Sequence, residues 1–371
     1  MFLHIIQAEP KFPQLIYRYF EAAMPGQHIY MLIHDNDGLC ENVPGARPLL
    51  RAEELRQIFK EHDNIDGVML HGVFRQVFDF LDAVPEEIKI AWFVWGFEAY
   101  EFLNPGDWGL FEPRTLAYRH KTPWKRFRAR LRPHYRKWQG KLRVFHQVMS
   151  RIDYICTHVR EEYELMGERG YTGKKQQWRE IPVVPLSDLL SDDIKIVDAS
   201  CRDIQVGNSA TPTNNHVDVF YRLREVCLDG RKVVVPLSYG AGDYRDFVLR
   251  EGRRLLGDAF DPVVDFMPLD QYLSRLHTCG TVIFNNYRQQ ALGNVISALW
   301  AGKTVYMGPS SALRGYQRVG LPVFHFGTQF DVERQLPAAD DIERSRKILT
   351  QWMGDEASIS HLRTFLLSLQ E

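Results

Sequence analysis

Short apolar runs alternate with amphipathic segments along the whole chain, and this alternation limits the possible folds more than any other feature. The apolar runs predict strands at 2–7, 28–34, 67–72, 89–96, 154–158, 203–208, 232–238, 263–267, 281–286 and 304–308. Segments with helical periodicity lie between them, for example at 12–23, 52–62, 245–257 and 269–279. This order predicts βαβ units and therefore an α/β protein with mostly parallel sheets.

The chain is long enough for two domains, because 371 residues are more than one hydrophobic core usually serves. A break falls near residues 185–202, which join two series of predicted strands. We therefore predict two Rossmann-like domains, an N-terminal one over 1–190 and a C-terminal one over 200–345. Residues 346–371 are predicted to form a helical segment that packs back on the N-terminal domain.

The composition is that of an ordinary folded protein, with 45% hydrophobic and 25% charged residues. A net charge of −1 argues against a general nucleic-acid binder. Five cysteines without metal-type spacing fit a reducing cytoplasm. The opening MFLHIIQAEPKF is too short an apolar run for a secretory signal, and no run is long enough to span a bilayer. We therefore expect a cytoplasmic protein.

Small and polar residues follow one predicted strand in the stretch IQVGNSATPTNNH (204–216). A glycine lets the backbone approach a partner closely, and hydroxyl and amide side chains can cap a helix or bind phosphate oxygens. A capped surface loop and a ligand-binding loop both fit this pattern. The candidate ligand contacts are Gly207, Asn208, Ser209, Thr211, Asn214 and Asn215.

A second polar stretch, NNYRQQALGNVISALWAG (285–302), joins a predicted strand to a helix that begins near Leu292 or Gly293. The N–H groups and partial positive charge of a helix N-terminus suit a diphosphate. Arg288 can donate further hydrogen bonds to phosphates. The candidate contacts to sugar hydroxyl or acetamido groups are Gln289, Gln290 and Asn294. A solvated strand–helix loop is the alternative.

The stretch LSYGAGDY (237–244) is a third candidate element of the same site. Tyr239 can stack on a nucleobase, and Gly240 and Gly242 allow the turn, although a simple glycine turn explains them equally well. Ligands of parallel sheets bind beyond the carboxyl ends of the strands. All three stretches follow strands of one domain, so they are predicted to border one site.

Four stretches together resemble glycosyltransferase family 56, the enterobacterial 4-acetamido-4,6-dideoxygalactose (Fuc4NAc) transferases. They are IQVGNSATPTNNH, VVVPLSYGAGDY, FMPLDQYLSRLHTCGTVIFNNYRQQALGNVISALWAGKTVYM and, in the first half, WFVWGFEAYEF. Their order and spacing cover most of residues 90–325. The resemblance implies the GT-B fold, in which two Rossmann-like domains with mostly parallel sheets face each other across a cleft.

The resemblance also implies an activity. We expect an inverting, metal-independent glycosyltransferase that uses no cofactor. Its donor is expected to be a dTDP-, UDP- or GDP-sugar, and dTDP-Fuc4NAc is one candidate. The implied acceptor is lipid-linked or a glycan in bacterial surface polysaccharide synthesis. A capsule or lipopolysaccharide transferase with another donor is one alternative, and a non-catalytic module that binds sugar nucleotides is the other.

An inverting transfer needs a base that takes the proton of the acceptor hydroxyl. Glu98, just beyond the strand that carries WFVWG, is our first candidate, and His71, at the end of GVMLHG, is the second. Glu101 is close enough in sequence to exchange roles with Glu98. A surface carboxylate and a structural histidine are the ordinary alternatives.

The sequence HDNDG (34–38) contains an Asp-x-Asp pattern of the kind that metal-dependent GT-A transferases use. Asp and Asn before Gly are also typical of turns, and the pattern occurs too early in the chain for such a metal site. We therefore predict a turn at Asp35–Asp37 and no metal, so that Arg288 and helix dipoles must meet the charge of the leaving group.

Residues 120–147 carry ten Lys or Arg and no acidic residue, with aromatic rings between them. This basic strip suits an anionic membrane surface, while a solvated face and nucleic-acid binding are the alternatives. The near-neutral net charge favours the membrane, so we expect peripheral association with the inner face of the cell membrane. The predicted membrane contacts are Trp124, Lys125, Arg126, Arg128, Arg130, Arg132, Arg136 and Lys137.

Overall fold

The computed structural model describes residues 1–7, 12–33, 38–72, 77–96, 98–100, 109–120, 127, 141–182, 184–191 and 194–371. The chain divides into two compact units, and each is described by itself. Unit 1 comprises Met1–Leu103, His134–Asp188 and Thr350–Glu371. Unit 2 comprises Asn104–Pro133 and Leu189–Leu349, so residues 104–133 group with the second unit although the sequence analysis counted them with the first.

Unit 1 is built on a seven-stranded sheet in the order β3-β2-β1-β4-β5-β6-β7, and every pair of neighbours is parallel. The strands are β1 (Phe2–Gln7), β2 (His28–Ile33), β3 (Arg47–Leu49), β4 (Gly67–His71), β5 (Lys89–Phe93), β6 (Tyr154–Thr157) and β7 (Gln177–Glu180). The α-helices are α1 (Phe12–Ala23), α2 (Ala52–Glu61), α3 (Phe78–Leu81), α7 (Lys141–Arg151), α8 (Arg160–Glu168) and α16 (Asp355–Leu367). Short 3₁₀ turns occur at η1 (Leu39–Asn42) and η3 (Leu186–Asp188).

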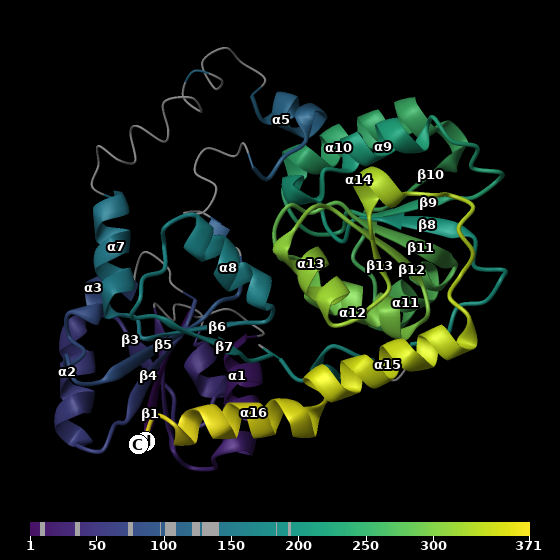
Figure 1. Cartoon of the computed structure of the whole chain (residues 1–371). Coiled ribbons are helices and arrows are strands. Elements are labelled where there is room, and N and C mark those ends of the chain that lie inside the picture. The colour runs from purple at the N-terminus through teal and green to yellow at the C-terminus, as the bar shows by residue number, and fades with distance from the viewer. Residues whose placement is uncertain are drawn as a thin grey trace. The chain divides into compact units, whose positions relative to one another are not determined.

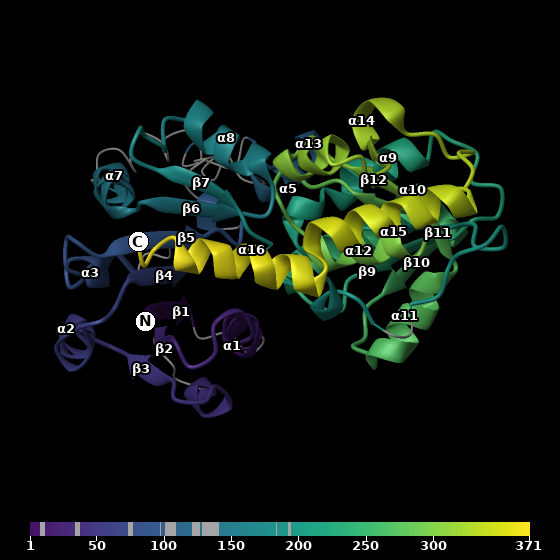
Figure 2. The ribbon, with the colours of Figure 1, turned by 60° about the horizontal axis from the view of Figure 1, so that its bottom comes forward.

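Helices α1 and α16 pack side by side on one face of this sheet (Figure 2). Alternate residues of the strands, among them Phe2, Met69 and Phe93, form a core with Phe20 of α1 and Leu362 of α16. This two-residue alternation is what a sheet face requires, while α1 carries apolar residues at helical spacing. The hydroxyl of Tyr19 donates to the carbonyl of Ser358 at 3.0 Å, which further ties the two helices together.

Unit 2 contains a six-stranded parallel sheet in the order β10-β9-β8-β11-β12-β13 (Figure 1). The strands are β8 (Asp203–Val206), β9 (Val233–Pro236), β10 (Phe260–Val263), β11 (Cys279–Phe284), β12 (Thr304–Met307) and β13 (Val323–His325). The α-helices are α5 (Pro113–Arg119), α9 (His216–Leu223), α10 (Gly242–Leu256), α11 (Leu269–His277), α12 (Leu292–Trp300), α13 (Ser311–Arg318), α14 (Phe326–Gln329) and α15 (Ala339–Met353), whose last residues group with unit 1. Short 3₁₀ turns occur at η4 (Pro212–Asn214) and η5 (Gly257–Ala259).

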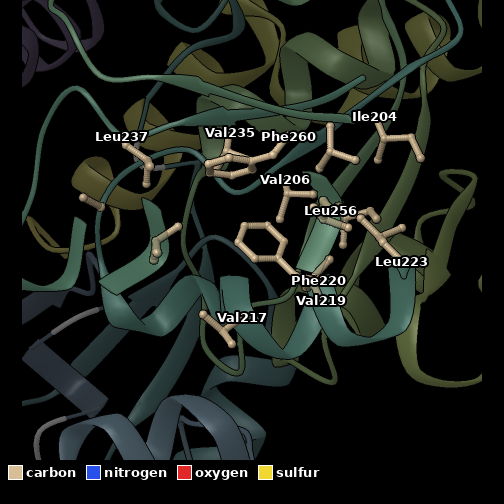
Figure 3. Packing of buried hydrophobic residues seen from close by; sticks show 14 of the residues in the cluster. Ile204, Val206, Val217, Val219, Phe220, Leu223, Val235, Leu237, Leu256 and Phe260 are labelled. Atoms are coloured by element: carbon tan, nitrogen blue, oxygen red, sulfur yellow. The ribbon is translucent and has the colours of Figure 1, made fainter. Parts of the chain in front are cut away.

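The core of unit 2 lies between the sheet and helices α9 and α10. Figure 3 shows Phe220 of α9 facing Val206 of β8, and Phe260 of β10 belongs to the same cluster. Burying one such side chain completely contributes about 1.5–3 kcal/mol to the free energy of folding. Val234 and Cys279 belong to a second cluster with Leu276 of α11, so apolar clusters pack against both faces of this sheet.

Helix α5 joins unit 2 through polar contacts with α9. The carboxylate of Asp218 accepts hydrogen bonds from the backbone N–H groups of Arg114 and Thr115, at 2.8 and 2.9 Å, and from the Thr115 hydroxyl at 2.7 Å. These bonds satisfy N–H groups that a helix leaves unpaired at its N-terminus. At the other end, the Tyr118 hydroxyl donates to Asp243 at 2.9 Å, and its ring stacks on Phe247. The prediction of two α/β units with parallel sheets is confirmed.

Candidate functional site

Both sheets place a topological switch point beside their first strand, where the strand order reverses. In unit 2 this point lies between β8 and β11, because β9 and β10 follow on one side and β12 and β13 on the other. Ligands of open α/β sheets bind at the carboxyl ends of the strands at such a point. The loops that leave β8 and β11 there are residues 207–215 and 285–291, which are two of the three stretches selected from the sequence.

The loop after β8 is held by its own side chains. Ser209 and Thr211 share a hydroxyl–hydroxyl bond of 2.9 Å, and the amide of Asn214 donates to the Ser209 carbonyl at 3.0 Å. Gly207 has a positive φ of 69°, and a Cβ there would lie 2.5 Å from Nε2 of His216. Glycine is therefore required by the packing of the loop itself, and these four predicted residues shape the loop.

Asn215 also has a structural part. It has a left-handed backbone (φ 52°) at the start of α9, and its Oδ1 accepts from the backbone N–H of Glu112 at 2.9 Å. Its amide group donates to the carbonyls of Asn285, at 2.9 Å, and Leu110, at 3.2 Å. Both ends of this side chain are therefore engaged, and they tie the segment before α5 to the end of β11.

Four buried polar atoms around the switch point make no hydrogen bond to any described residue: Oδ1 of Asn208, Oδ1 of Asn286, Oε1 of Gln289 and Nε2 of His216. Leaving such a buried group unpaired costs about 1–3 kcal/mol. All four residues belong to the loops after β8 and β11 or to the first residue of α9. Water or a ligand that reached these atoms would recover this cost. Asn286 and His216 were not among the residues selected from the sequence.

The N-terminus of α12 adds an anion-binding feature. Ala291, the residue before the helix, has a left-handed backbone with φ of 60°, which is strained for a residue other than glycine. The first turn, Leu292–Asn294, directs its backbone N–H groups away from the helix. A Cβ at Gly293 would meet nothing closer than 3.7 Å, so this glycine is not required by tight packing.

Arg288 is oriented by its neighbours in this loop. Its Nε donates to Oε1 of Gln290 at 3.1 Å, and the same oxygen accepts from the hydroxyl of Thr213 at 2.6 Å. Gln290 therefore links the arginine to the loop after β8. This arrangement places a guanidinium within the same cluster of loops as the unpaired amide oxygens.

The third stretch follows β9. Gly240 has φ of 118° and forms an isolated parallel β-bridge with Ala210. A Cβ at Gly240 would lie 2.6 Å from the carbonyl oxygen of Ala210. The ring of Tyr239 is 57% exposed, and its hydroxyl accepts from the amide of Asn208 at 3.1 Å. A second exposed ring, Phe266, which is 90% exposed, follows the neighbouring strand β10 and was not selected from the sequence. Exposed rings at strand ends suit stacking on a planar ligand.

In unit 1, Glu98 lies shortly after β5 and is only 4% exposed. One carboxylate oxygen accepts from the backbone N–H of Trp95 at 2.7 Å, while Oε2 makes no hydrogen bond to a described residue. Burial raises the pKa of Glu98 to about 7, and the nearby carboxylate of Glu162 acts in the same direction. A carboxylate with such a pKa can accept a proton near neutral pH.

Other buried ionisable residues share this end of the sheet. His71 is the last residue of β4, is 3% exposed, and has its pKa lowered to about 3 by burial. His158 follows β6 directly, and Glu162 lies in the first turn of α8. Neither residue was selected from the sequence, where an acidic residue such as Glu162 at the start of a helix is ordinary helix chemistry.

Several predicted residues lie outside the described part of the chain. They are Glu101, the Asp-x-Asp residues Asp35 and Asp37, and the membrane candidates Trp124, Lys125, Arg126, Arg128, Arg130, Arg132, Arg136 and Lys137. Within the described residues, no group of three or more His, Cys, Asp or Glu side chains is arranged to hold a metal ion.

Solved structures with similar coordinates identify the fold of this chain. A glycosyltransferase from Rickettsia africae ESF-5 matches with a TM-score of 0.60 and 10% identity, over 100% of this chain and 98% of the other. Anabaena HepE in complex with UDP and glucose matches with a TM-score of 0.62 and 10% identity, over 99% of both chains. The E. coli structure described as trehalose-6-phosphate bound with UDP-2-fluoro glucose matches with a TM-score of 0.61 and 7% identity, over 100% of this chain and 99% of the other. The fold is GT-B.

Residues 171–334 match the family described as 4-alpha-L-fucosyltransferase, glycosyl transferase group 56. This region contains β8–β12 and all three loops of the candidate site in unit 2. The resemblance expected from the sequence is confirmed, and the chain is a glycosyltransferase.

Proposed function

We propose that the protein transfers a sugar from a nucleotide diphosphate donor, bound by unit 2, to a hydroxyl group of a lipid-linked or glycan acceptor. The observation that carries this proposal is the group of unpaired polar atoms beside the N-terminus of α12, at the switch point of the sheet. Backbone N–H groups and Arg288 suit the diphosphate, while amide oxygens suit sugar hydroxyl and amide hydrogens. The neighbour HepE holds UDP and glucose, which supports a donor of this class.

We propose Glu98 as the base of this reaction. As the acceptor oxygen bonds to the anomeric carbon, its proton passes to the Glu98 carboxylate and the bond between the anomeric carbon and the diphosphate oxygen breaks. The leaving diphosphate takes up the electron pair, and Arg288 with the positive end of α12 stabilises its charge. The sugar configuration is then inverted, because one displacement occurs at the anomeric carbon.

The proposed donor within this class is dTDP-Fuc4NAc or a related UDP- or GDP-sugar, used in bacterial surface polysaccharide synthesis. One feature supports an acetamido sugar: the unpaired Oδ1 atoms of Asn208 and Asn286 can accept from its N–H. The match to the family described as 4-alpha-L-fucosyltransferase covers the proposed donor loops and supports a deoxy sugar. Gln289 and Asn294 can bind the sugar hydroxyls, and Tyr239 can stack on the base.

A thermal-shift screen in the presence of EDTA tests the proposed function. We expect a nucleoside diphosphate, among UDP, dTDP and GDP at 1 mM, to raise Tm without any divalent metal, with a nucleoside lacking phosphate as control. A ligand present at about 100 times its Kd stabilises the folded state by about 2.7 kcal/mol. A shift that requires Mn²⁺ and disappears in the variant Asp35→Ala/Asp37→Ala would instead assign the diphosphate to a metal. No shift with any of the three diphosphates would contradict a donor site.

We further propose that the basic strip of residues 120–147 docks the protein on an anionic membrane, where a lipid-linked acceptor resides. No helix in the described part of the chain is long and apolar enough to cross a bilayer. The proposed attraction is electrostatic, with about 1 kcal/mol for each cation near anionic lipid.

Vesicle sedimentation tests the basic strip. We expect binding to vesicles with anionic lipid, weakening with salt, and little binding to neutral vesicles. Binding should be lost when four residues are changed to Glu: Arg128, Arg130, Arg132 and Arg136. The matched control changes four exposed arginines elsewhere to Glu: Arg56, Arg224, Arg250 and Arg344. Equal loss in both variants would show that total charge, and not this strip, determines binding.

A further inference from the structure

Three histidines form a diagonal row on one face of the unit 1 sheet. His28 begins β2, His4 lies in the middle of β1, and His71 ends β4. In the strand register, Phe2 pairs with His28 and Ile6 pairs with His71, so each neighbour of His4 is displaced by two residues. Diagonal neighbours on one sheet face are within reach of each other's rings. The row therefore runs across three neighbouring strands, from the amino end of β2 to the carboxyl end of β4, beside the switch point.

The rings of this row are joined by two hydrogen bonds. Nδ1 of His4 lies 3.0 Å from Nε2 of His71, and Nε2 of His4 lies 3.0 Å from Nδ1 of His28. His4 is fully buried, and aromatic rings pack around the row, including Phe20 at 4.4 Å and Tyr30 at 4.8 Å between ring centroids. Because each bond needs one proton, a neutral His4 must donate to one neighbour and accept from the other.

The row therefore has only two neutral arrangements. In one, every ring carries its proton on Nε2, so that Nδ1 of His71 keeps a lone pair. In the other, every ring carries it on Nδ1, and the lone pair lies on Nε2 of His28. The surroundings of His28 decide between them, because that nitrogen is buried and makes no hydrogen bond to a described residue.

His28 lies against the carboxyl end of α1. Burial lowers the pKa of His28, and the Glu21 carboxylate and the carbonyls of Phe20 and Met24 oppose this effect. The other charged groups that act on the row are its own rings and the N-terminal ammonium of Met1. Carbonyl oxygens attract an N–H and repel a lone pair, and a helix carboxyl end favours a cation. Both effects favour the arrangement in which His28 carries the proton on Nε2.

We infer that His4 and His28 are positioning residues that keep a lone pair on Nδ1 of His71, and that the row passes a proton accepted by His71 to His28. This inference rests on the proposed function, and it gives the one proton that the acceptor hydroxyl releases a second route beside Glu98.

The proton transfer balances as follows along the row. A hydroxyl proton adds to Nδ1 of His71, whose Nε2 proton passes to Nδ1 of His4, whose Nε2 proton passes to Nδ1 of His28. His28 then carries protons on both nitrogens and the positive charge, close to Glu21. After the product leaves, the reverse shift moves the protons back along the row, and Nδ1 of His71 releases its proton to water. The row thus places the charge at the ring where the Glu21 carboxylate and the carbonyls of Phe20 and Met24 oppose the effect of burial.

The first test uses the protein without substrate, so it does not depend on the reaction. Long-range ¹H–¹⁵N spectra of protein labelled at histidine nitrogen report the position of each ring proton, and His→Gln variants assign the signals. At pH 7.5 we expect the proton on Nε2 of His71 and His4. On acidification we expect His28 to gain its second proton before the other two. A proton on Nδ1 of His71 would overturn the inference, whatever the protein transfers.

The second test measures turnover and its pH profile with the nucleotide sugar that the thermal-shift screen selects. His4→Phe keeps a ring but removes both hydrogen bonds, and we expect kcat to fall about tenfold, with the acid limb of the profile displaced and the donor KM unchanged. His4→Gln can hydrogen-bond but cannot relay a proton, so it should keep the Tm of the unchanged protein while its kcat is as low as that of His4→Phe. The control Ile6→Val, on the same strand face, should lower Tm slightly and leave the profile unchanged.

The two variants of His4 separate a relay from a structural role. Full recovery of kcat in His4→Gln would show that the row only fills the core and would overturn the inference. Loss of turnover in Glu98→Gln with an unchanged profile in both His4 variants would overturn it as well, while leaving the proposed function intact. Correct ring tautomers without any transferase turnover would instead contradict the proposed function alone.

Discussion

Replacing Glu98 by Gln is expected to lower kcat by about 10²–10⁴ while donor binding is retained, which is the usual effect of losing a general base. The carboxylate is buried, keeps one oxygen without a described partner, and has a pKa raised to about 7. The ionised form, which accepts the proton, therefore predominates only above pH 7. In the unchanged protein kcat/KM should rise with pH up to about 7, and Glu98→Gln should remove this dependence.

The same substitution has a predictable effect on stability. Burial raises the pKa of Glu98 above its ordinary value near 4.5, so the folded state binds the proton more tightly than the unfolded state. The stabilisation by this group is therefore complete below pH 4.5 and is lost as the pH rises through 7. At pH 8.5, Glu98→Gln should be more stable than the unchanged protein by about 3 kcal/mol, since the pKa rises from 4.5 to about 7 and each pKa unit corresponds to about 1.4 kcal/mol.

Urea unfolding at pH 5 and pH 8.5 measures this difference, and Glu53→Gln, with a carboxylate that is 73% exposed, is the matched control. The control should change neither activity nor the pH dependence of stability. Near-full turnover in Glu98→Gln, combined with loss of turnover in His71→Ala, would transfer the role of base to His71. Loss of folding in Glu98→Gln at both pH values would contradict the account of this carboxylate as destabilising when ionised.

The fold followed from the sequence wherever a strand is buried on both faces. The runs at 2–7, 28–34 and 67–72 lie within one residue of β1, β2 and β4, because central strands of parallel sheets are continuous apolar runs. The three strands missed, β3, β7 and β13, are all at sheet edges and have three or four residues each. β10, another edge strand, was placed three residues too late, since Pro262 within it reads as a break.

The candidate site was foreseen only in part. Strand ends and glycines identified the loops after β8, β9 and β11, because the carboxyl ends of parallel strands share one edge. The division of roles within the loops was not visible in the sequence. Asn208 and Asn215 are the same residue type, yet Asn208 keeps an oxygen without a described partner while Asn215 is engaged at both ends by segments far away in the chain. The histidine row was missed for the same reason, since its rings meet only through the register of three strands.

Arg288→Ala is expected to raise the Kd of a nucleoside diphosphate tenfold or more, because a charge-assisted hydrogen bond contributes about 1.5–3 kcal/mol. The guanidinium is held by Gln290, which is itself held by Thr213 of the loop after β8, so the orientation does not have to be created on binding. Arg288→Lys should restore only part of the affinity, since an ammonium group cannot donate to Gln290 and to two phosphate oxygens in the same fork.

Isothermal titration with UDP, dTDP and GDP, each paired with its nucleoside, separates a phosphate contact from a base contact. The loss of affinity in Arg288→Ala should appear with the diphosphate and be absent with the nucleoside. It should become smaller as salt is added. Arg344→Ala, which removes an arginine that is 70% exposed on α15, is the control for net charge. An equal loss for diphosphate and nucleoside would mean that Arg288 supports the loop and does not contact phosphate. In that case the first turn of α12 alone must hold the diphosphate, and the strained backbone of Ala291 becomes the feature to alter next.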